Sequence, residues 1–590
     1  MFLKTKFKMR RIVMLDLGFK LTKIKEQAIE NCAGIVYDEV PKTPEDVDFV
    51  GKGFRAVTPL LKKSDDRPVM AHYEAGYFIS KMCVNPTRSY DEYMERLLLI
   101  KHAEEESGMN RFISVEDFTI CELVRIYSLL KGRINVSDEM WDKVADALIT
   151  APYAPFHEPM SENHKLCFMS SEFVAAKLFP DGVFHDGLDG KTRLIPLRSY
   201  LIKFLHKRLK RGWCEYDSVS YYEINYMSLL NLYDFSEDEE IKRLASDCLN
   251  AMTASVYYHS VASNPAGPKG RVYPNNLENP ETSILNTVII GSERGDREIK
   301  EHLPTSTMFM ATSAFMFDEE VYALVKGEIK GDYEIKDSVS LYTIPDDMYI
   351  KGRTYKYFYR SENWCMGSIA GRDNPYEDMA YTWLVGHQEQ MWSATFKENI
   401  KAVIYSSHPG HPGLPDYGAH YVWTGDSNCW CQKYAQDKNK LLCYWNIKDE
   451  KQLQYIHFYL PEDEFDKVEY KGREIYVTIG KTKVKITVSC DIEKVTEGAY
   501  KDRELIFNQP RGAFSVEIAE DGNAFDGTLI LMENGAEYKN LRIEDEISYV
   551  NDKEIDKSEY KLYNSPYLTS EYDSGEIFLE VNGKRRRYGI

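Results

Sequence analysis

The chain has 590 residues, of which 74 are Lys or Arg and 93 are Asp or Glu, so its formal net charge is −19. Hydrophobic residues make up 43% and charged residues 28%, which is typical of a globular protein and too apolar for a disordered chain. The acidic balance argues against a general nucleic-acid binder, which needs a basic surface. It also disfavours an anionic substrate, unless positive charge gathers locally around the site.

The N-terminal segment carries no strong targeting signal. Its basic residues precede an apolar stretch, residues 12–19, that is short and interrupted by Asp16. A secretory signal has an unbroken apolar region followed by small residues at the cleavage site. No stretch approaches roughly 18 apolar residues, so we expect no membrane span. The 11 cysteines form no regular framework, and we therefore expect mostly reduced, structural cysteines and a cytoplasmic location.

Apolar residues recur at three- and four-residue spacing up to about residue 330, which predicts helices. The clearest stripes run over residues 118–130, 141–148, 197–209 and 241–256. The last stripe follows Ser236-x-x-Glu239, a spacing typical of a capping box at a helix start. Short Gly, Pro and Asp breaks separate the helices. The pattern predicts a succession of antiparallel helical hairpins, as in a bundle, a solenoid or a closed toroid.

After residue 330 apolar and polar residues alternate, which predicts strands. Residues 474–479 and 482–488 are β-branched runs separated by Gly480-Lys481, which indicates a hairpin. Residues 527–532 and 576–581 predict further strands, and Asn582-Gly583 after the second is a strong turn signal. We therefore predict an all-β half that forms a large antiparallel sandwich.

These patterns divide the chain into a helical domain, residues 1–330, and an antiparallel β-sandwich domain, residues 331–590. The second range has 44 acidic and 32 basic residues. The β half therefore carries −12 of the net charge and the helical half −7. The acidity is concentrated away from the helical half.

Three short segments of the helical half gather polar and aromatic residues where helices are expected to meet loops. They are Ser161-Glu-Asn-His164, residues 211–226 and residues 270–273. The first stands just before a helix that we expect to begin around Ser170. Each segment taken alone is well explained by helix capping and turn filling. The three together, on successive hairpins, indicate a cleft.

Asn163-His164, followed 58 residues later by Tyr222, resembles the active-site arrangement of the (α/α)-toroid polysaccharide lyases, the alginate-lyase and heparinase-type superfamily. Residues 211–222 are similar to a Gly-aromatic-x-Glu … Ser-x-x-Tyr segment of some heparinase-like proteins. The resemblance covers residues 90–330, and the β half only in architecture. It implies an N-terminal (α/α) toroid, an incomplete barrel of helical hairpins, followed by the sandwich. It also implies β-elimination on a uronate-containing glycan.

The resemblance assigns catalysis to Asn163, His164 and Tyr222. Tyr221 is the alternative to Tyr222, because neighbouring residues on a helix point about 100° apart. β-Elimination removes a proton next to a carboxylate, so an amide donor such as Asn163 and a cation can stabilise the developing enolate. His164 would be the base, with Tyr222 as the acid, or a neutral partner to the sugar. A tyrosine exchanges protons well only if nearby positive charge lowers its pKa.

A basic run precedes the two tyrosines and would supply that charge if its last member, Arg211, faces the cleft. The run consists of Lys203, Lys207, Arg208, Lys210 and Arg211. Basic residues at a helix C-terminus also complement the helix dipole, which explains Arg211 equally well and the others better. The candidates for binding the sugar are polar or aromatic: Glu162, Glu215 and Arg271 for its hydroxyls, and Trp213 and Tyr273 for stacking on its rings.

The β half offers three histidines. His387 would enter the cleft if, as in heparinase-type lyases, the sandwich domain supplies a second histidine, although packing in a strand explains it as well. His408 and His411, in a Pro/Gly loop, are too few for a metal site. We predict no required cofactor, and a structural zinc or calcium ion in the β domain is not predicted. The expected partner is an acidic oligo- or polysaccharide, without nucleic acid or membrane, and a homodimer is compatible with the sequence.

Two other functions remain open from the sequence. Toroids also host glycoside hydrolases, and Glu162, Glu215 and Asp217 could supply a pair of carboxylates. Their separation would then decide between a retaining mechanism, at about 5–5.5 Å, and an inverting one, at roughly 6.5–9.5 Å. The chain could also be a non-catalytic glycan-binding protein. The product discriminates, because elimination leaves a new carbon–carbon double bond, hydrolysis a saturated end, and a binding protein no product.

Overall fold

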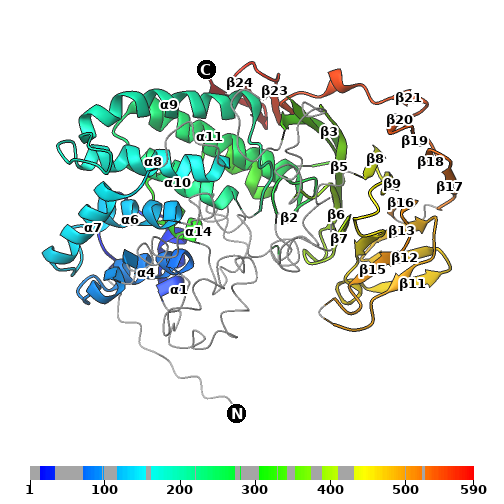
Figure 1. The fold of residues 1–590 in the computed structure, drawn as a ribbon, viewed down its shortest axis with the longest axis horizontal. Helices are drawn as coiled ribbons and strands as arrows, with labels where there is room; N and C mark the ends of the chain where they lie inside the picture. The colour runs from blue at the N-terminus through cyan, green and yellow to red at the C-terminus, as the bar shows by residue number, and fades with distance from the viewer. Residues whose placement is uncertain are drawn as a thin grey trace, which may run out of the picture.

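The structure is a computed structural model with helices in the first half and antiparallel strands in the second (Figure 1). It describes residues 14–33, 71–95, 97–98, 116–153, 161–219, 221–262, 264–272, 280, 305–328, 330–341, 352–373, 389–409, 431–498, 500–520 and 525–590. The last described helical segment ends at Glu328, and the first strand of the large sheets begins at Tyr333. The expected fold class, a helical domain followed by an antiparallel β domain, is confirmed.

A helix is present at each of the four expected stripes. The structure describes helices α1 (Lys23–Ala33), α4 (Ala71–Val84), α6 (Glu116–Leu130), α7 (Asp138–Thr150), α8 (Glu162–Leu178), α9 (Gly190–Arg211), α10 (Tyr222–Phe235), α11 (Glu239–Tyr258), α14 (Thr305–Ala311) and α15 (Glu319–Ala323), which continues into a π-helical turn, Leu324–Glu328. Two details differ from expectation. Helix α8 begins at Glu162, well before Ser170. Helix α11 is capped by Asp238, whose carboxylate accepts hydrogen bonds from the N–H groups of Glu240 and Ile241, and not by a capping box from Ser236.

The helices form an inner and an outer layer. In α8, 14 of 17 residues are buried, whereas α9, which packs on it, buries 8 of 22. The inner helices α6, α8 and α10 run side by side in the same direction. Near their starts Asp117 of α6 bonds His164 of α8, and further along Arg125 of α6 bonds Asn231 of α10. None of the described helices combines the length and the apolar character needed to cross a bilayer.

The described residues then form four antiparallel sheets, besides the small hairpin β1 (Ser260–Val261) and β2 (Asn264–Pro265). The eight-stranded sheet contains, in spatial order, β14 (Glu493–Lys494), β15 (Glu504–Phe507), β10 (Ile456–Tyr459), β7 (Val403–Ser407), β6 (Trp392–Phe396), β5 (Trp364–Arg372), β4 (Arg353–Arg360) and β3 (Tyr333–Ser340). The six-stranded sheet contains β11 (Lys467–Lys471), β12 (Glu474–Ile479), β13 (Thr482–Val488), β16 (Arg511–Glu520), β9 (Lys440–Asn446) and β8 (Gln432–Asp437).

The remaining two sheets come last in the chain. The five-stranded sheet contains β17 (Leu529–Met532), β18 (Gly535–Tyr538), β19 (Leu541–Glu544), β20 (Ile547–Val550) and β21 (Lys553–Glu554). The four-stranded sheet contains β22 (Tyr563–Asn564), β23 (Leu568–Ser570), β24 (Glu576–Val581) and β25 (Lys584–Gly589). The hairpins expected at Gly480-Lys481 and Asn582-Gly583 join β12 to β13 and β24 to β25.

The predicted sandwich is confirmed by the packing of the two largest sheets. Their inner faces share one apolar cluster, in which the rings of Trp392 on β6 and Phe514 on β16 lie 5.6 Å apart. The five-stranded sheet covers the other face of the six-stranded sheet, with Tyr538 and Leu541 packed near Leu442. The β half is therefore three sheets deep at this end.

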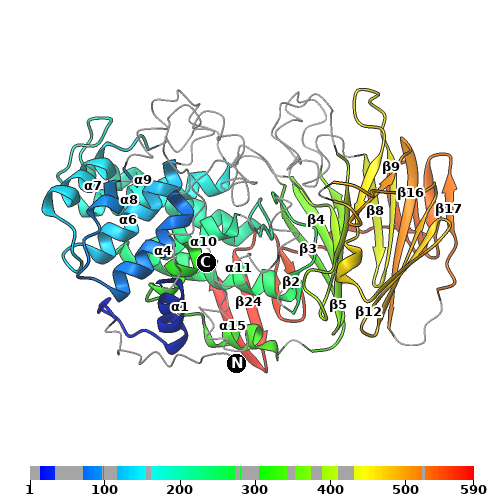
Figure 2. The same ribbon diagram turned by 90° about the horizontal axis from the view of Figure 1, so that it is seen from below.

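The four-stranded sheet at the end of the chain packs against the helices. In both views β24 lies near α11, in the middle of the molecule between the outlying helices α6 and α7 and the sandwich (Figures 1 and 2). Leu562, Ile577 and Leu579 belong to the same apolar cluster as the helices, and the N–H of Gly589 donates to Asp247 of α11. The two halves of the chain are thus held together at both the sandwich and this sheet.

Candidate functional site

The candidate site lies at the N-terminal ends of the inner helices α8 and α10. The first turn of α8 carries Glu162, Asn163 and His164. The loop between α9 and α10 begins at Gly212, which takes a positive φ of 69° that favours glycine. It ends where the N–H of Tyr221 donates to Ser218 Oγ at 2.9 Å, which fixes the direction in which α10 starts. These turns bring residues 161–164 close to residues 213–219.

A chain of polar contacts joins Asn163 to Tyr221. Asn163 Nδ2 lies 2.9 and 2.8 Å from the two carboxylate oxygens of Glu215. Arg271 Nη1 donates to Glu215 Oε1 at 2.7 Å, and the Arg271 guanidinium lies 3.9 Å from the centre of the Tyr221 ring. Asn163 and Glu215 are fully buried, while the Arg271 side chain is 12% exposed. Arg271 is therefore the partly exposed cation at the edge of the buried pair of Asn163 and Glu215.

The amide of Asn163 cannot serve as expected from the sequence. Its Nδ2 donates to Glu215 and, at 2.9 Å, to Ser161 Oγ. The carboxylate on one side fixes which amide atom is the nitrogen, because an oxygen there would be repelled. The atom left without a hydrogen-bond partner is Oδ1, an acceptor. The expectation that Asn163 donates to a substrate carboxylate is thus corrected: in this arrangement it can only accept.

His164 is held by a carboxylate. Its Nδ1 lies 2.8 Å from Asp117 Oδ2, and its ring stacks on Phe118 with a centroid distance of 5.1 Å. Asp117 is fully buried, and burial raises the pKa of its carboxyl, which the contact with the His164 ring opposes. A carboxylate on Nδ1 favours the tautomer with its proton there, which leaves the lone pair on Nε2. The partly exposed imidazole can then accept a proton.

Tyr222 and Trp213 lie in the core. Tyr222 is 3% exposed, and burial, together with the charge of Asp217, raises the pKa of its phenol well above the ordinary value. Its ring meets that of Trp213 edge to face at 6.4 Å. The lowered pKa expected for Tyr222 is therefore not found, and Trp213, also 3% exposed, has no face left for stacking on a sugar. Between the two tyrosines, it is Tyr221 that adjoins a cation.

Two other expected sugar ligands are engaged elsewhere. Arg211 pairs with Asp573 in the C-terminal segment, so the basic run does not direct its last member at the tyrosines. Glu162 is fully buried, pairs with Arg208, and accepts hydrogen bonds from the N–H groups of Cys214 (3.0 Å) and Glu215 (2.6 Å). The substrate contacts expected of both residues stay predictions, and in the structure their charged groups fix the loop before α10.

The remaining candidates fall partly outside the described residues. Tyr273, His387 and His411 lie there. His408 is buried, with Nε2 2.7 Å from the carbonyl oxygen of Leu453. The described residues contain no group of three side chains that could hold a metal ion.

A buried ionic network adjoins the site and joins the two halves. Asp217 accepts from Lys356 Nζ of β4 at 2.6 Å. The His259 ring lies 3.1 Å from both Asp217 and Asp337 of β3. Although burial acts in the opposite direction, Lys356 and His259 hold the pKa of the Asp217 carboxyl below its ordinary value. Asp217 is thus kept ionised as part of the domain contact.

Two residues of this region, Asp117 and Asn225, are not among the candidates that the sequence suggests. Asn225 lies on α10 one turn after Tyr221 and is fully buried. The sequence places Asp117 four residues before Cys121 and Asn225 three residues before Ser228, so each pair lies on one face of its helix. This spacing indicates a buried polar face only once α6, α8 and α10 are known to be inner helices.

Comparison with known proteins finds similarity only among solved structures. No family model and no curated protein matches the sequence. A crystal structure of heparinase III is 9% identical, with a TM-score of 0.42, and the match covers 98% of this chain and 93% of that one. A chondroitinase AC lyase is 10% identical, with a TM-score of 0.38, covering 96% and 98%. A chondroitin AC lyase of Streptomyces coelicolor is 8% identical, with a TM-score of 0.34, covering 95% and 91%. The activities in these names are those of the other proteins.

Proposed function

We propose that the chain is a lyase that cleaves a uronate-containing oligo- or polysaccharide by β-elimination. The observation that carries the proposal is that a guanidinium, a phenol and a carboxylate-held imidazole gather at the same end of parallel inner helices. These are Arg271, Tyr221 and His164 with Asp117. Elimination next to a carboxylate needs a cation for that carboxylate and two groups that exchange protons.

Arg271 is the group that would neutralise the uronate carboxylate. A neutralised carboxylate lowers the cost of the enolate that forms when the adjacent proton leaves. Glu215 holds one end of the guanidinium at 2.7 Å, and the Tyr221 ring supports its face. Because both contacts are made before any ligand arrives, the guanidinium loses little conformational freedom on binding.

Tyr221 and His164 would exchange the protons. A cation beside a phenol favours its ionised form, so the position of Arg271 suits Tyr221 to take or return a proton. His164, with Nδ1 bound to Asp117, offers Nε2 as the second proton carrier. This moves the tyrosine role from Tyr222, which the sequence favoured, to its neighbour.

The helix ends also support an anionic substrate. Inner helices α6, α8 and α10 are parallel, so their positive N-terminal ends lie on the same side. Their partial charges act locally, whereas the net charge of −19 is distributed over the whole surface and screened by salt.

Hydrolysis has less support. A glycoside hydrolase needs one carboxylic acid that stays protonated. Glu162 pairs with Arg208, Glu215 with Arg271, and Asp217 with Lys356. Each of these carboxylates is thus already engaged in an ion pair with a cation of the protein.

Two conservative substitutions test the assignment of the tyrosine. Tyr221→Phe removes the proposed proton carrier, so we expect turnover to fall on the order of 10²–10⁴-fold with little loss of binding. Tyr222→Phe is the matched control, and should keep near-normal turnover because this phenol lies in the core. The assay measures the absorbance of the new double bond with uronate-containing oligosaccharides.

The two outcomes separate the alternatives. Loss of turnover in Tyr222→Phe with activity kept in Tyr221→Phe would reverse the assignment. A saturated product would indicate hydrolysis. Binding of the oligosaccharide without any product would indicate a glycan-binding protein.

A further inference from the structure

The inner helices stack polar side chains in layers one helical turn apart. Cys167 Sγ of α8 lies 3.1 Å from Ser228 Oγ of α10, and Cys121 Sγ of α6 lies 4.0 Å from the same oxygen. These three residues form a middle layer. A deep layer lies one turn towards the C-terminal ends of the helices, and an upper layer one turn towards their N-terminal ends, where the candidate site is.

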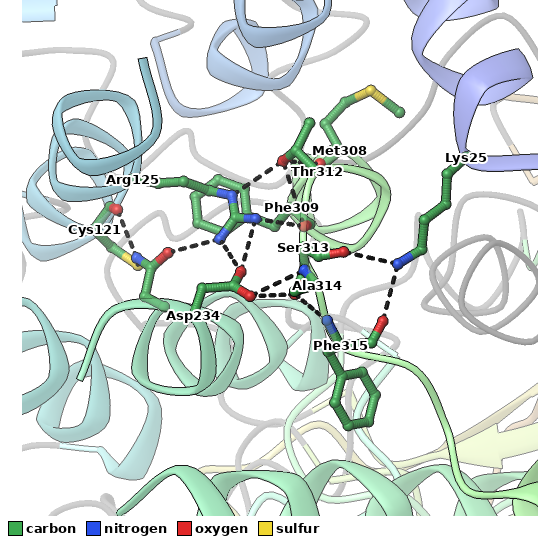
Figure 3. Close-up of polar contacts among 11 residues, drawn as sticks. Lys25, Cys121, Arg125, Asp234, Met308, Phe309, Thr312, Ser313, Ala314 and Phe315 are labelled. Atoms are coloured by element: carbon green, nitrogen blue, oxygen red, sulfur yellow. Dashed lines mark hydrogen bonds and ion pairs between the residues drawn. The ribbon is translucent and has the colours of Figure 1, made fainter. Parts of the chain in front are cut away.

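In the deep layer the central groups are well supplied with partners. Arg125 donates to Asn231, Asp234, Thr312 and the carbonyl oxygen of Phe309, at 2.9–3.1 Å (Figure 3). The other oxygen of Asp234 accepts from Ser313 Oγ and the N–H of Ala314, both at 3.0 Å, and Asn231 Nδ2 donates to the carbonyl oxygen of Cys121. This is how a buried polar group behaves when its role is structural.

In the upper layer several buried polar atoms have no hydrogen-bond partner among the described residues, and these include both polar atoms of one amide. Both amide atoms of Asn225 lack one, as do Asn163 Oδ1 and Asp117 Oδ1. All three residues are fully buried. A buried amide without partners destabilises the fold, so a protein that keeps one there gains something else from it.

Helix geometry places Asn225 on the side of α10 that faces α8. Moving three residues back along a helix turns the side chain by about 60°. From Cys167 this step leads to His164, which turns towards α6, where it bonds Asp117. The same step on the parallel helix α10 leads from Ser228 to Asn225, which therefore turns towards α8 and the free Oδ1 of Asn163.

We propose that Asn225 and Asn163 form a buried subsite that binds a sugar hydroxyl group. A hydroxyl can donate to Asn163 Oδ1 and at the same time accept from Asn225 Nδ2. A carboxylate or sulfate can only accept, so it would leave Asn163 Oδ1 unpaired, and an ammonium group can only donate. The subsite deepens the proposed function, on which it rests, by adding hydroxyl recognition beside the carboxylate site of Arg271.

Asn225→Leu tests the subsite, because leucine has the same branching and the same number of side-chain heavy atoms as asparagine but no polar atoms. If Asn225 serves a ligand, the substitution should leave the thermal unfolding midpoint unchanged or raise it, since an unpaired buried amide is removed. The matched control is Asn231→Leu, in the deep layer, which breaks satisfied hydrogen bonds and should lower the midpoint.

Binding is measured by calorimetry in the Tyr221→Phe background, which should bind sugar without turning it over. The probes are hexasaccharides containing glucuronate, mannuronate or galacturonate, and a neutral glucose hexasaccharide. We expect Asn225→Leu to weaken binding of the uronate ligand about tenfold, the loss typical of one buried hydrogen-bonding group.

The outcomes separate the subsite from the proposed function. A lower midpoint with unchanged binding in Asn225→Leu would overturn the subsite and make Asn225 a structural residue held by ordered water, while leaving the lyase assignment intact. Asn225-dependent binding of the neutral hexasaccharide alone would support the subsite and overturn the uronate specificity. Binding of no probe would overturn both.

Discussion

At the scale of single residues, the pair of Arg271 and Glu215 is asymmetric. Glu215 is fully buried, whereas the Arg271 side chain is 12% exposed and can be reached by water. Removing the partner of a fully buried charge costs about 3–5 kcal/mol, because the remaining charge is neither paired nor hydrated. The same loss is smaller when the remaining charge meets solvent.

We therefore expect Arg271→Gln to destabilise the protein more than Glu215→Gln, and the double variant to recover part of the loss. Urea unfolding followed by intrinsic fluorescence measures the three variants, together with the unchanged chain. Equal losses in the two single variants would mean that the carboxylate of Glu215 is adequately solvated by Asn163 and its other neighbours. The order of stabilities thus tests whether the buried Glu215 carboxylate requires Arg271 as its ion-pair partner.

The sequence locates these residues better than it assigns their roles. The density of polar and aromatic side chains around Asn163, Glu215 and Arg271 is visible along the chain, and the structure brings them together. The amide nitrogen of Asn163 donates to Glu215, which is 52 positions away in the sequence, so this contact cannot be predicted from the local pattern. We reassign the tyrosine role from Tyr222 to Tyr221 because the Arg271 guanidinium lies over the Tyr221 ring. The local sequence does not show which of the two neighbouring rings makes this contact.

At the scale of helices, the periodicity of apolar residues predicts outer helices correctly but does not locate the ends of inner helices. Helix α9 buries one side, so its apolar stripe is visible in the sequence. Helix α8 is buried almost all round and carries polar groups towards the site, so its first turn shows no stripe and its start is placed too late. In the β half, the turns at Gly480-Lys481 and Asn582-Gly583 fix register locally, and these hairpins are predicted correctly.

The deep polar layer should dominate the stability of the helical half. Arg125 is fully buried and links α6 to α10, to α14 and to Thr312 just after α14. Lys25 of α1 binds the carbonyl oxygens of Ser313 and Phe315 in the same segment (Figure 3). Arg125→Met leaves Asp234 buried without its cation, so we expect a loss of about 3–5 kcal/mol.

Arg198→Met is the control for this prediction. Arg198 of α9 also bonds carboxylates, those of Asp238 and Glu240, but its side chain is 45% exposed. Exposed ion pairs contribute roughly 0–1 kcal/mol. Chemical denaturation followed by far-ultraviolet circular dichroism compares the two variants. A loss in Arg125→Met no larger than in Arg198→Met would show that the layer does not hold the inner helices together.

At the scale of the whole molecule, the contact between the two halves contains a buried lysine. Lys269 follows the β2 strand, is 3% exposed, and its Nζ donates to Gln390 Oε1 at 2.9 Å just before β6. Their backbones also form a two-way bridge. Burial lowers the pKa of the Lys269 ammonium to about 7, which the negative charge of Asp217 partly opposes. The domain contact should therefore respond to pH.

The sign of the pH dependence of stability follows from the number of protons bound to Lys269 in the folded and unfolded states. Between pH 7 and pH 10.5, Lys269 is largely neutral in the folded protein and protonated in the unfolded chain. The unfolded state binds more protons there, so this residue makes stability rise with pH across that window and has no further effect below it.

Lys269→Met removes the titration, and the increase in melting temperature from pH 7 to about pH 9 should be smaller than in the unchanged protein. Lys191→Met, whose lysine is 65% exposed on α9, should keep the full increase, as measured by differential scanning fluorimetry. Parallel curves for the unchanged protein and Lys269→Met would mean that Lys269 stays charged in the folded state, with Asp217 supplying the necessary compensation across the domain boundary.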